Sequence, residues 1–511
     1  MTDQHETILG PPGTGKTQTN SNKVRDCLEQ GIPPDRIACV SFTRKAAQES
    51  RQRVCHDWNI EERDMPYFQT LHSMAFRAGG YSSDEVIGPK DMAEIGDAVG
   101  IPFGKRGRLD IESDFDTLGV TKGDFYMSQY HLARSMRIPL PDMHCQLGDH
   151  NINWSELKRL AAAYEDYKEV RKKIDFTDMI DNFIRAGNGP NVEALFVDEA
   201  QDLSTLQWSM VDVLRKTPRI QVFTGDDDQA IMGFQGADVE AFLNATEKKT
   251  VLEQSYRVPR SVWQEAQSIV CRIEGRAPKT WRPKADDGMV QFHQNIEDVP
   301  LHEGEWCLLA RTNRIVSQYA DTLREDGLVY SRHGHPSIPA KTYEALDDWE
   351  KWAKGETLTP PKVHNVYSFM EAGKGYSKGF GPRSSALLEA LGGKVEISMS
   401  EARDKIGLLL DGSVRWHRAL GKIDLETMNY VLNALKRGDN VKNPRIKLST
   451  IHSMKGGEAD NILVVPDLSY AAHREYQRNP ATEHRVFYVA VTRAKKALHV
   501  MLPETNKCYE L

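Results

Sequence analysis

Residues 10–17 read Gly-Pro-Pro-Gly-Thr-Gly-Lys-Thr and match the pattern G-x-x-x-x-G-K-[ST] at every fixed position. A short apolar stretch precedes them, and a segment of helical character follows at residues 18–30. A phosphate-binding loop requires this order of strand, loop and helix. Because the match is complete and the context fits, we interpret the stretch as a nucleotide-binding loop rather than a turn before a helix.

The residue types of this loop predict how it would hold a nucleotide. Its glycines let backbone N–H groups and a helix N-terminus face phosphate oxygens. Lys16 would reach the β- and γ-phosphates, and the Thr17 hydroxyl would ligate Mg²⁺. We therefore expect ATP and Mg²⁺ as cofactors, bound by Gly10, Gly13, Thr14, Gly15, Lys16 and Thr17.

A second motif supplies carboxylates. The apolar run at residues 194–197 ends in Asp198 and Glu199, as a buried strand does when it delivers acids to the carboxyl edge of a parallel sheet. We expect Asp198 to ligate Mg²⁺ and Glu199 to polarise the attacking water. Alone, such a strand is mostly structural; behind a phosphate loop, the catalytic interpretation is favoured.

Further motifs follow in a fixed order along nearly the whole chain. They are S-F-T-R-K-A-A (41–47), T-L-H-S (70–73), D-F-T-D-M (175–179), D-E-A-Q-D (198–202), G-D-D-D-Q-A-I (225–231), Q-S-Y-R (254–257), T-I-H-S-M-K-G-G-E (450–458) and F-Y-V-A-V-T-R-A (487–494). The series resembles the UvrD/Rep/PcrA family of superfamily 1 DNA helicases. The resemblance implies an ATP-dependent motor on single-stranded DNA and on its junctions with duplex.

The resemblance also assigns roles outside the phosphate loop. Gln229 corresponds to the family's γ-phosphate sensor, and Arg257 and Arg493 correspond to two arginine fingers. A planar, permanently charged guanidinium suits the charge spread over the transferring phosphoryl oxygens. Tyr256 corresponds to the aromatic that stacks on adenine, and Glu458 to the residue that contacts the ribose. The predicted catalytic set is Lys16, Glu199, Gln229, Arg257 and Arg493.

For DNA, the resemblance indicates residues in both halves of the chain. They are Phe42, Thr43, Lys45, His72, Phe234, Thr450, His452 and Lys455. Phe234 matches an aromatic that stacks on a base, which is worth about 1–3 kcal/mol per base at such sites. For Phe42 and Phe234, packing in the core stays open as the alternative.

The motif positions predict the fold class and the domain order. We expect an α/β chain with two RecA-like P-loop modules, each with a parallel sheet and a mainly helical insertion. The first module covers 1–78 and 185–252 with its insertion at 79–184, where Leu157, Leu160, Tyr164 and Tyr167 recur at helical spacing as core residues. The second covers 253–355 and 441–511, with a reduced insertion at 356–440. For the glycine-rich basic stretch 373–381, a DNA-touching loop and an ordinary exposed loop are both open.

Composition is that of an ordinary globular chain. The net charge is −7, so nucleic acid would bind along a local track rather than through bulk charge. Seven scattered cysteines without a C-x-x-C pair argue against a zinc ribbon and a disulfide framework. No apolar run is long enough for a membrane span. We expect a cytoplasmic protein, a monomer or weak oligomer, with replication or repair proteins as candidate partners.

Several positions depart from the family pattern. Nine residues precede Gly10, which leaves no room for the upstream glutamine motif that reads adenine, so we expect looser nucleotide discrimination. Met232 and Gln235 stand where tyrosine and arginine are usual, and Gly457 replaces a bulky apolar residue. None of these changes affects the predicted catalytic set, so hydrolysis should survive.

Two motifs bear on the direction of movement. The forms D-E-A-Q-D and D-D-D-Q resemble the 3′→5′ branch of the superfamily, so we expect 3′→5′ translocation on single-stranded DNA with duplex unwinding. One alternative is a translocase that displaces proteins without robust unwinding. Another is an inactive binding module, against which the intact catalytic set argues.

Overall fold

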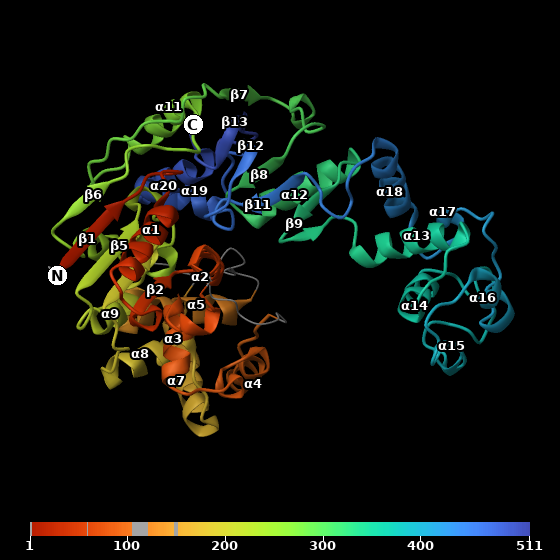
Figure 1. Ribbon diagram of the computed structural model, residues 1–511, viewed down its shortest axis with the longest axis horizontal. Helices are drawn as coiled ribbons and strands as arrows, with labels where there is room; N and C mark the ends of the chain where they lie inside the picture. The colour runs from red at the N-terminus through yellow and green to blue at the C-terminus, as the bar shows by residue number, and fades with distance from the viewer. Residues whose placement is uncertain (1–2, 59, 105–120, 148–151) are drawn as a thin grey trace. The chain divides into compact units, whose positions relative to one another are not determined.

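The computed structural model describes residues 3–58, 60–104, 121–147 and 152–511. The chain forms two compact units. The first consists of Met1–Ile296, Arg311–Asn313 and Thr450–Leu511, and the second of Glu297–Ala310 and Arg314–Ser449 (Figure 1). Within the described ranges, no helix is both long and apolar enough to cross a membrane.

The first unit is built on a six-stranded sheet in the order β3-β2-β4-β5-β1-β6. Its strands are β1 (Gln4–Leu9), β2 (Ile37–Ser41), β3 (Phe68–Thr70), β4 (Ala194–Asp198), β5 (Ile220–Gly225) and β6 (Lys249–Val251). All neighbouring strands are parallel. Their carboxyl ends therefore meet at one edge of the sheet, where open α/β sheets bind their ligands.

Helices cover both faces of this sheet, as a parallel sheet requires. Successive strand residues face opposite layers, so Phe196 and Val222 join one core cluster, whereas Val197 and Phe223 join the other. The helices are α1 (Lys16–Glu29), α2 (Arg44–Trp58), α3 (Leu71–Ala78), α8 (Phe176–Ala186), α9 (Thr205–Leu214) and α10 (Val239–Leu243) (Figure 1). The expected α/β fold class is confirmed.

Between α3 and α8 the chain forms a helical subdomain. Its helices are α4 (Pro89–Val99), α5 (Lys122–Ser135), α6 (Leu140–Leu147) and α7 (Trp154–Arg171). Leu157, Leu160 and Tyr164 are buried in its core, and Tyr167 packs against them. These α7 residues are therefore core, as expected from their spacing.

The D-F-T-D-M motif begins α8 with a capping box. The side chains of Asp175 and Asp178 each accept a hydrogen bond from the other's backbone N–H, at 2.8 and 2.9 Å. Both carboxylates also pair with Arg134 of α5 and Lys168 of α7. The motif thus fixes the start of α8 to two helices of the subdomain.

Three strands of a second sheet also lie in the first unit. They are β7 (Met289–His293), β12 (Ala459–Val464) and β13 (Ala494–Met501), and β13 pairs in parallel with both neighbours. The helices α11 (Arg260–Val270), α19 (Tyr470–Arg478) and α20 (Pro480–Val491) belong to this part. From Val486 to Val491, α20 is completely buried, which makes it the core of the segment that carries Arg493.

The second unit contains β8 (Trp306–Ala310), β9 (Tyr330–Arg332), β10 (His335–Pro336) and nearly all of β11 (Ile446–Thr450) and α12 (Asn313–Glu325). Strand β9 pairs in parallel with β11 and antiparallel with β10. Further helices are α13 (Ala340–Ala353), α14 (Pro360–Ser368), α15 (Ser385–Leu391), α16 (Met399–Lys405), α17 (Trp416–Ala419) and α18 (Leu425–Arg437). The predicted boundaries of modules and insertions stay a prediction.

In the glycine-rich stretch 373–381, the aromatic residues are structural. Tyr376 is buried and stacks on Tyr367, with ring centroids 5.4 Å apart, and Phe380 packs against the same core. Lys374 and Lys378 are exposed. The stretch therefore exposes two basic side chains but keeps its rings inside.

Candidate active site

The phosphate loop joins β1 to α1 and is closely packed. A Cβ at Gly10 would lie 2.1 Å from Lys16 Cγ, and a Cβ at Gly13 would lie 2.4 Å from the Cβ of Arg257. Gly13 and Gly15 have φ angles of +71° and +82°, the left-handed region in which glycine avoids strain. The Lys16 ammonium donates a hydrogen bond to the carbonyl of Gly10 at 2.7 Å.

The Q-S-Y-R segment (254–257) forms hydrogen bonds to the backbone of this loop. The backbone N–H of Tyr256 donates to the carbonyl of Gly13 at 2.8 Å, and the buried Ser255 hydroxyl donates to the carbonyl of Pro12 at 2.7 Å. Ser255 was not among the predicted site residues, although it lies inside a motif that was. Within the loop, the Thr14 hydroxyl donates to Pro11 at 2.8 Å, so Thr14 stabilises the loop's own turn.

The two carboxylates follow β4 directly. Glu199 has a φ angle of 50°, and a non-glycine residue in this region costs of order 1 kcal/mol. Its backbone N–H donates to Asp198 Oδ1 at 3.0 Å, and its side chain accepts from Gln201 Nε2 at 2.6 Å. The strained turn therefore begins directly after Asp198, the last residue of β4, and Gln201 holds the Glu199 side chain.

Electrostatics separate the roles of these two acids. Burial and the neighbouring Glu199 carboxylate raise the pKa of Asp198 to about 7. Although burial opposes it, the ammonium groups of Lys16 and Lys455 hold the pKa of Glu199 below its usual value. Glu199 is thus ionised, as a residue that polarises water must be.

The residues at this edge fit ATP with Mg²⁺. Lys16, the loop N–H groups and the N-terminus of α1 suit phosphate oxygens. The Thr17 hydroxyl and the Asp198 carboxylate are oxygen donors of the kind that Mg²⁺ prefers. A divalent cation beside Asp198 would also relieve the repulsion that raises its pKa.

Arg493 lies beside the predicted phosphate sensor. The Nη2 group of this fully buried arginine donates to Gln229 Oε1 at 2.7 Å. Gln229 Nε2 in turn donates to Asp226 Oδ2 at 2.6 Å. Burial, followed by the nearby Arg257 cation, lowers the pKa of Arg493 to about 9. A nearby anion would favour the charged form of Arg493.

Arg257, the second predicted arginine finger, forms an ion pair with Glu458, the residue predicted to contact the ribose. Arg257 Nε donates to Glu458 Oε2 at 2.6 Å. Tyr256, expected to stack on adenine, is 75% exposed, so its ring is accessible to a base. The structure thus brings Arg257, Glu458 and Tyr256 together beside the phosphate loop.

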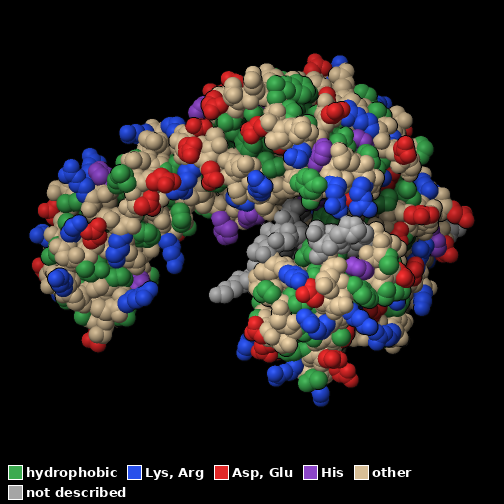
Figure 2. All heavy atoms as spheres, turned by 180° about the vertical axis from the view of Figure 1, so that it is seen from behind, with side chains coloured by type: hydrophobic (Ala, Val, Ile, Leu, Met, Phe, Trp, Pro, Cys, Tyr) green, Lys and Arg blue, Asp and Glu red, His purple; other side chains and the backbone are tan. Residues whose placement is uncertain are grey.

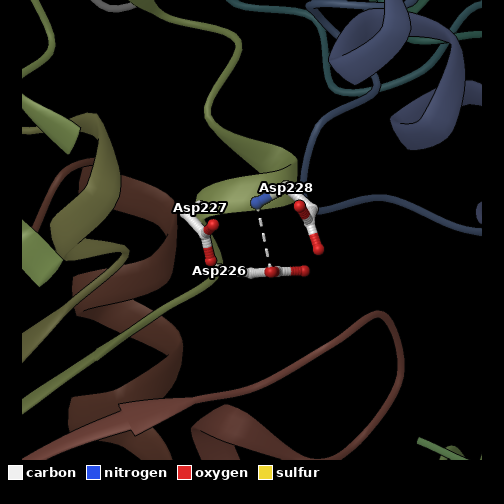
Figure 3. A group of neighbouring side chains, drawn as sticks. All are labelled: Asp226, Asp227 and Asp228. Atoms are coloured by element: carbon white, nitrogen blue, oxygen red, sulfur yellow. Dashed lines mark hydrogen bonds between the residues drawn. The ribbon is translucent and has the colours of Figure 1, made fainter. Parts of the chain in front are cut away.

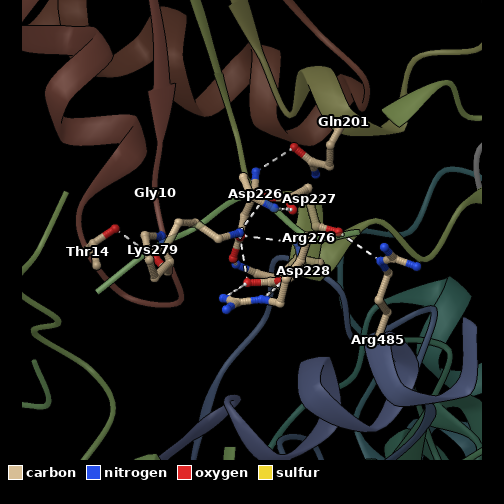
Figure 4. Close-up of polar contacts among 12 residues, drawn as sticks. Gly10, Thr14, Gln201, Asp226, Asp227, Asp228, Arg276, Lys279 and Arg485 are labelled. Carbon is tan, nitrogen blue, oxygen red and sulfur yellow. Dashed lines mark hydrogen bonds and ion pairs between the residues drawn. The ribbon is translucent and has the colours of Figure 1, made fainter. Parts of the chain in front are cut away.

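The 3₁₀ turn η6 (Asp227–Gln229) begins with a cluster that sequence reasoning missed. Asp226, Asp227 and Asp228, here called the aspartate trio, are buried together (Figure 3). Lys279 pairs with all three carboxylates, and Arg276 binds Asp228 through two nitrogens at 2.6 and 2.8 Å (Figure 4). The sequence feature that could have predicted this cluster is the run of three successive aspartates, because buried carboxylates need basic partners.

Family comparisons agree with this geometry. A family model described as an AAA domain matches residues 1–235, which include the phosphate loop and the carboxylates. A second, described as a UvrD-like helicase C-terminal domain, matches residues 419–505, which include Glu458 and Arg493. Together with the relatives, these matches support a UvrD/PcrA-like superfamily 1 helicase.

Relatives of this chain include proteins named ATP-dependent DNA helicase PcrA. The one from Staphylococcus epidermidis is 24% identical over 370 residues, which is 64% of this chain and 48% of the relative. The one from Leuconostoc citreum is 22% identical over 434 residues, 78% of this chain and 56% of the relative. The chain spans about half the length of the curated relatives it matches.

In this UvrD/PcrA-like chain, the first group of predicted DNA residues lies near α2 and α3. Phe42 is buried in the core, where the alternative interpretation put it. Thr43 caps α2 by accepting from the Ala46 N–H at 3.2 Å. The side chain of Lys45 lies outside what the structure describes. His72 contacts Phe176 edge-on, with centroids 5.7 Å apart.

His72 lines a cavity of about 510 Å³ between α3, α4 and α8. Burial and the nearby Arg44 lower the pKa of His72 to about 4. The imidazole is therefore neutral near pH 7, a form that can hydrogen-bond or stack. A phosphate contact by an imidazolium is not supported.

The second group surrounds the sensor segment. Phe234 packs edge-on against His452, with centroids 5.4 Å apart, and Thr450 donates to the Ser453 hydroxyl at 3.0 Å. The Lys455 ammonium lies 2.6 Å from Asp202 Oδ1 and 2.7 Å from the carbonyl of Gln229. Lys455 is therefore paired with Asp202. Its contact with DNA stays a prediction, and such a contact would require the pair of Lys455 and Asp202 to separate.

Two departures from the family pattern have a visible cause. Met232 is buried in the core, where an apolar side chain fits. A Cβ at Gly457 would lie 2.7 Å from Met454 Sδ and 3.1 Å from the Met454 carbonyl oxygen. A bulkier residue at this position would therefore require Met454 to shift.

Proposed function

We propose that this chain is an ATP-driven motor that moves 3′→5′ along single-stranded DNA and separates duplex. One observation carries the hydrolysis part of the proposal: Arg257 lies against Gly13 of the phosphate loop, and the charges of Lys16 and Arg493 both act on Glu199, although these residues are far apart in sequence. The relatives printed as ATP-dependent DNA helicases support the nucleic-acid part.

The residues at the loop can carry out hydrolysis as follows. Glu199 is ionised and accepts a proton from water as the water oxygen bonds to the γ-phosphorus. The bond to the bridging oxygen breaks, and ADP leaves with the electron pair. Mg²⁺, when bound, neutralises charge on the phosphate oxygens. Arg257 and Arg493 would stabilise the equatorial oxygens of the transferring group.

The ion pairs predict where hydrolysis would couple to DNA. Lys455 contacts Asp202 of the catalytic segment and the backbone of Gln229, and it belongs to the same turn as His452. A change at the γ-phosphate therefore acts on a segment that also carries predicted DNA residues. Coupling requires only that ATP binds one arrangement of these groups better than another.

The 3′→5′ direction rests on the motif forms D-E-A-Q-D and D-D-D-Q. A translocase without robust unwinding is the second candidate.

Basic and acidic side chains are interspersed over the face shown in Figure 2, which favours a local DNA track over a broad basic surface.

Strand separation tests the proposal directly. Matched duplexes carry a 3′ or a 5′ single-stranded tail, with Mg²⁺ and ATP present, and Glu199→Gln serves as the inactive control. We expect the 3′-tailed duplex to open, and the variant to open neither. Opening of the 5′-tailed duplex alone contradicts the direction. Phosphate release stimulated by single strands without any opening selects the translocase, and no phosphate release overturns both candidates.

A further inference from the structure

The aspartate trio places three carboxylates next to one another in the protein interior. Asp226, Asp227 and Asp228 are each at most 1% exposed. Buried carboxylates side by side lose hydration and repel one another, so they stay ionised only beside cations. Their oxygens come close enough together to hold a metal ion, but the Lys279 ammonium reaches all three.

Lys279 lies on the coil that follows α11 and extends its side chain into the trio (Figure 4). Its Nζ is 2.5 Å from Asp226 Oδ1 and 2.7 Å from Asp228 Oδ2, and it also pairs with Asp227. The side chain has no exposed surface. Although burial opposes it, the three aspartates raise the pKa of Lys279 above its usual value, so the amine stays charged.

The other basic groups at the trio contact atoms other than the Asp226 carboxylate. Arg276 binds Asp228, and the Arg485 guanidinium donates to the Asp227 carbonyl oxygen at 3.0 Å. In the part of the chain that the structure describes, Lys279 is the one cation that forms an ion pair with Asp226. This difference separates Lys279 from Arg276 although both belong to one cluster.

Asp226 links Lys279 to Gln229, the predicted γ-phosphate sensor. Its second oxygen accepts from Gln229 Nε2 at 2.6 Å. A carboxamide has a donor end and an acceptor end, so this bond turns the oxygen of Gln229 toward Arg493. The Asp226 backbone N–H also donates to Gln201 Oε1 at 3.0 Å, and Gln201 holds Glu199.

We propose that Lys279 is a positioning residue for ATP hydrolysis, which holds Asp226 ionised and in place so that the carboxamide of Gln229 keeps its oxygen toward Arg493. The inference rests on the proposed function, because it concerns the same hydrolysis. Lys279 touches none of the reacting atoms and acts through Asp226. It ties the coil after α11 to the sensor segment after β5.

The test compares Lys279→Met with Arg276→Gln in DNA-stimulated phosphate release. Both variants remove one cation from the trio, but only Lys279→Met removes the cation that forms an ion pair with Asp226. We expect Lys279→Met to lower kcat by roughly 10-fold to 100-fold, with the KM for ATP changed less than about threefold, because Gln229 acts at the transition state. Arg276→Gln keeps kcat near the wild-type value.

A double-mutant cycle separates positioning from general damage. If Lys279 acts through Gln229, the variant Lys279→Met/Gln229→Ala is no slower than Gln229→Ala alone. Losses that multiply overturn the inference. The same holds if Lys279→Met hydrolyses ATP at the wild-type rate, or if Arg276→Gln loses as much kcat as Lys279→Met.

A balanced variant covers the case in which Lys279→Met does not fold. Asp227→Asn/Lys279→Met removes one charge of each sign, with Asp227→Asn as its control. We expect the double variant to bind a fluorescent ADP analogue normally and to lose kcat as described above. Wild-type kcat in the double variant overturns the inference alone. An inactive wild-type protein overturns the proposed function as well.

Discussion

The carboxamide oxygen of Gln229 accepts a hydrogen bond of 2.7 Å from the guanidinium of Arg493. These residues are 264 positions apart in the sequence, yet the contact is completely buried. Gln229 follows β5 of the phosphate-loop sheet, whereas Arg493 immediately precedes β13. The predicted nucleotide sensor and a predicted arginine finger are therefore in direct contact.

Replacement of Arg493 by lysine should stop hydrolysis while nucleotide binding persists. Lysine keeps a charge but cannot contact Gln229 and a phosphate oxygen with one planar group. We expect kcat to fall by about 1,000-fold, and the affinity for ADP, which lacks the γ-phosphate, to stay unchanged. Arg260→Lys on the exposed side of α11 is the control. A kcat within about threefold of wild type would exclude Arg493 as a finger.

The pair of Glu458 and Arg257 predicts a split between KM and kcat. If Glu458 contacts the ribose, Glu458→Gln removes ground-state binding and raises the KM for ATP by about 10-fold. Steady-state phosphate release measures both constants, with Glu253→Gln at an exposed ion pair as the control. An unchanged KM with a reduced kcat would mean that Glu458 acts on Arg257 rather than on ATP.

Two glycines with similar backbone angles should respond differently to alanine. Gly13 and Gly31 have φ angles of +71° and +81°, but a Cβ at Gly31 meets nothing within 4 Å. Both Gly→Ala changes add strain of about 1 kcal/mol. Only Gly13→Ala also displaces Arg257, so we expect it alone to abolish phosphate release. Equal loss of activity in both variants would assign the effect to backbone strain.

Glu6 of β1 predicts a pH-dependent contribution to stability. Burial opposes its ionisation, but hydrogen bonds from Lys23 and Thr250 outweigh this and lower the pKa of Glu6 to about 2. A depressed carboxyl pKa stabilises the fold above its ordinary value of 4.5, and this contribution is lost as the pH falls toward 2. We expect Glu6→Gln to cost on the order of 2 kcal/mol at neutral pH.

Thermal unfolding at several pH values checks this prediction. The midpoint of Glu6→Gln should lie below that of the wild type at neutral pH, and the two should converge as the pH falls through about 2. Glu29→Gln, at an exposed pair 3.9 Å from Arg25, should match the wild type throughout. A gap that persists at low pH would show that Glu6 stabilises β1 through packing rather than charge.

The local parts of the fold and the site could be predicted from sequence. The phosphate loop needs glycines at fixed spacing because its backbone turns closely around Lys16, and that spacing is visible in the chain. The apolar run before Asp198 is a buried parallel strand, and the α7 residues at helical spacing are core. Each of these depends on neighbours within a few residues.

Contacts across long stretches could not be predicted. Lys279 lies more than 50 positions from its aspartates, in a coil whose sequence has no periodicity. The motif predicts that Lys455 contacts DNA, but it does not reveal the ion pair that Lys455 forms with Asp202. The burial of Phe42 likewise depends on helices that begin elsewhere in the chain.

The placement of α3 and α8 bears on how such a chain can change over evolution. The helical subdomain leaves the sheet after α3 and returns at α8, and these helices pack against each other, with His72 on Phe176. Whatever lies between them begins and ends at neighbouring points. Lengthening such an excursion costs only about 0.6 kcal/mol per doubling in closure entropy. Whole subdomains could therefore be enlarged, trimmed or exchanged there while the chemistry at Lys16 is inherited unchanged.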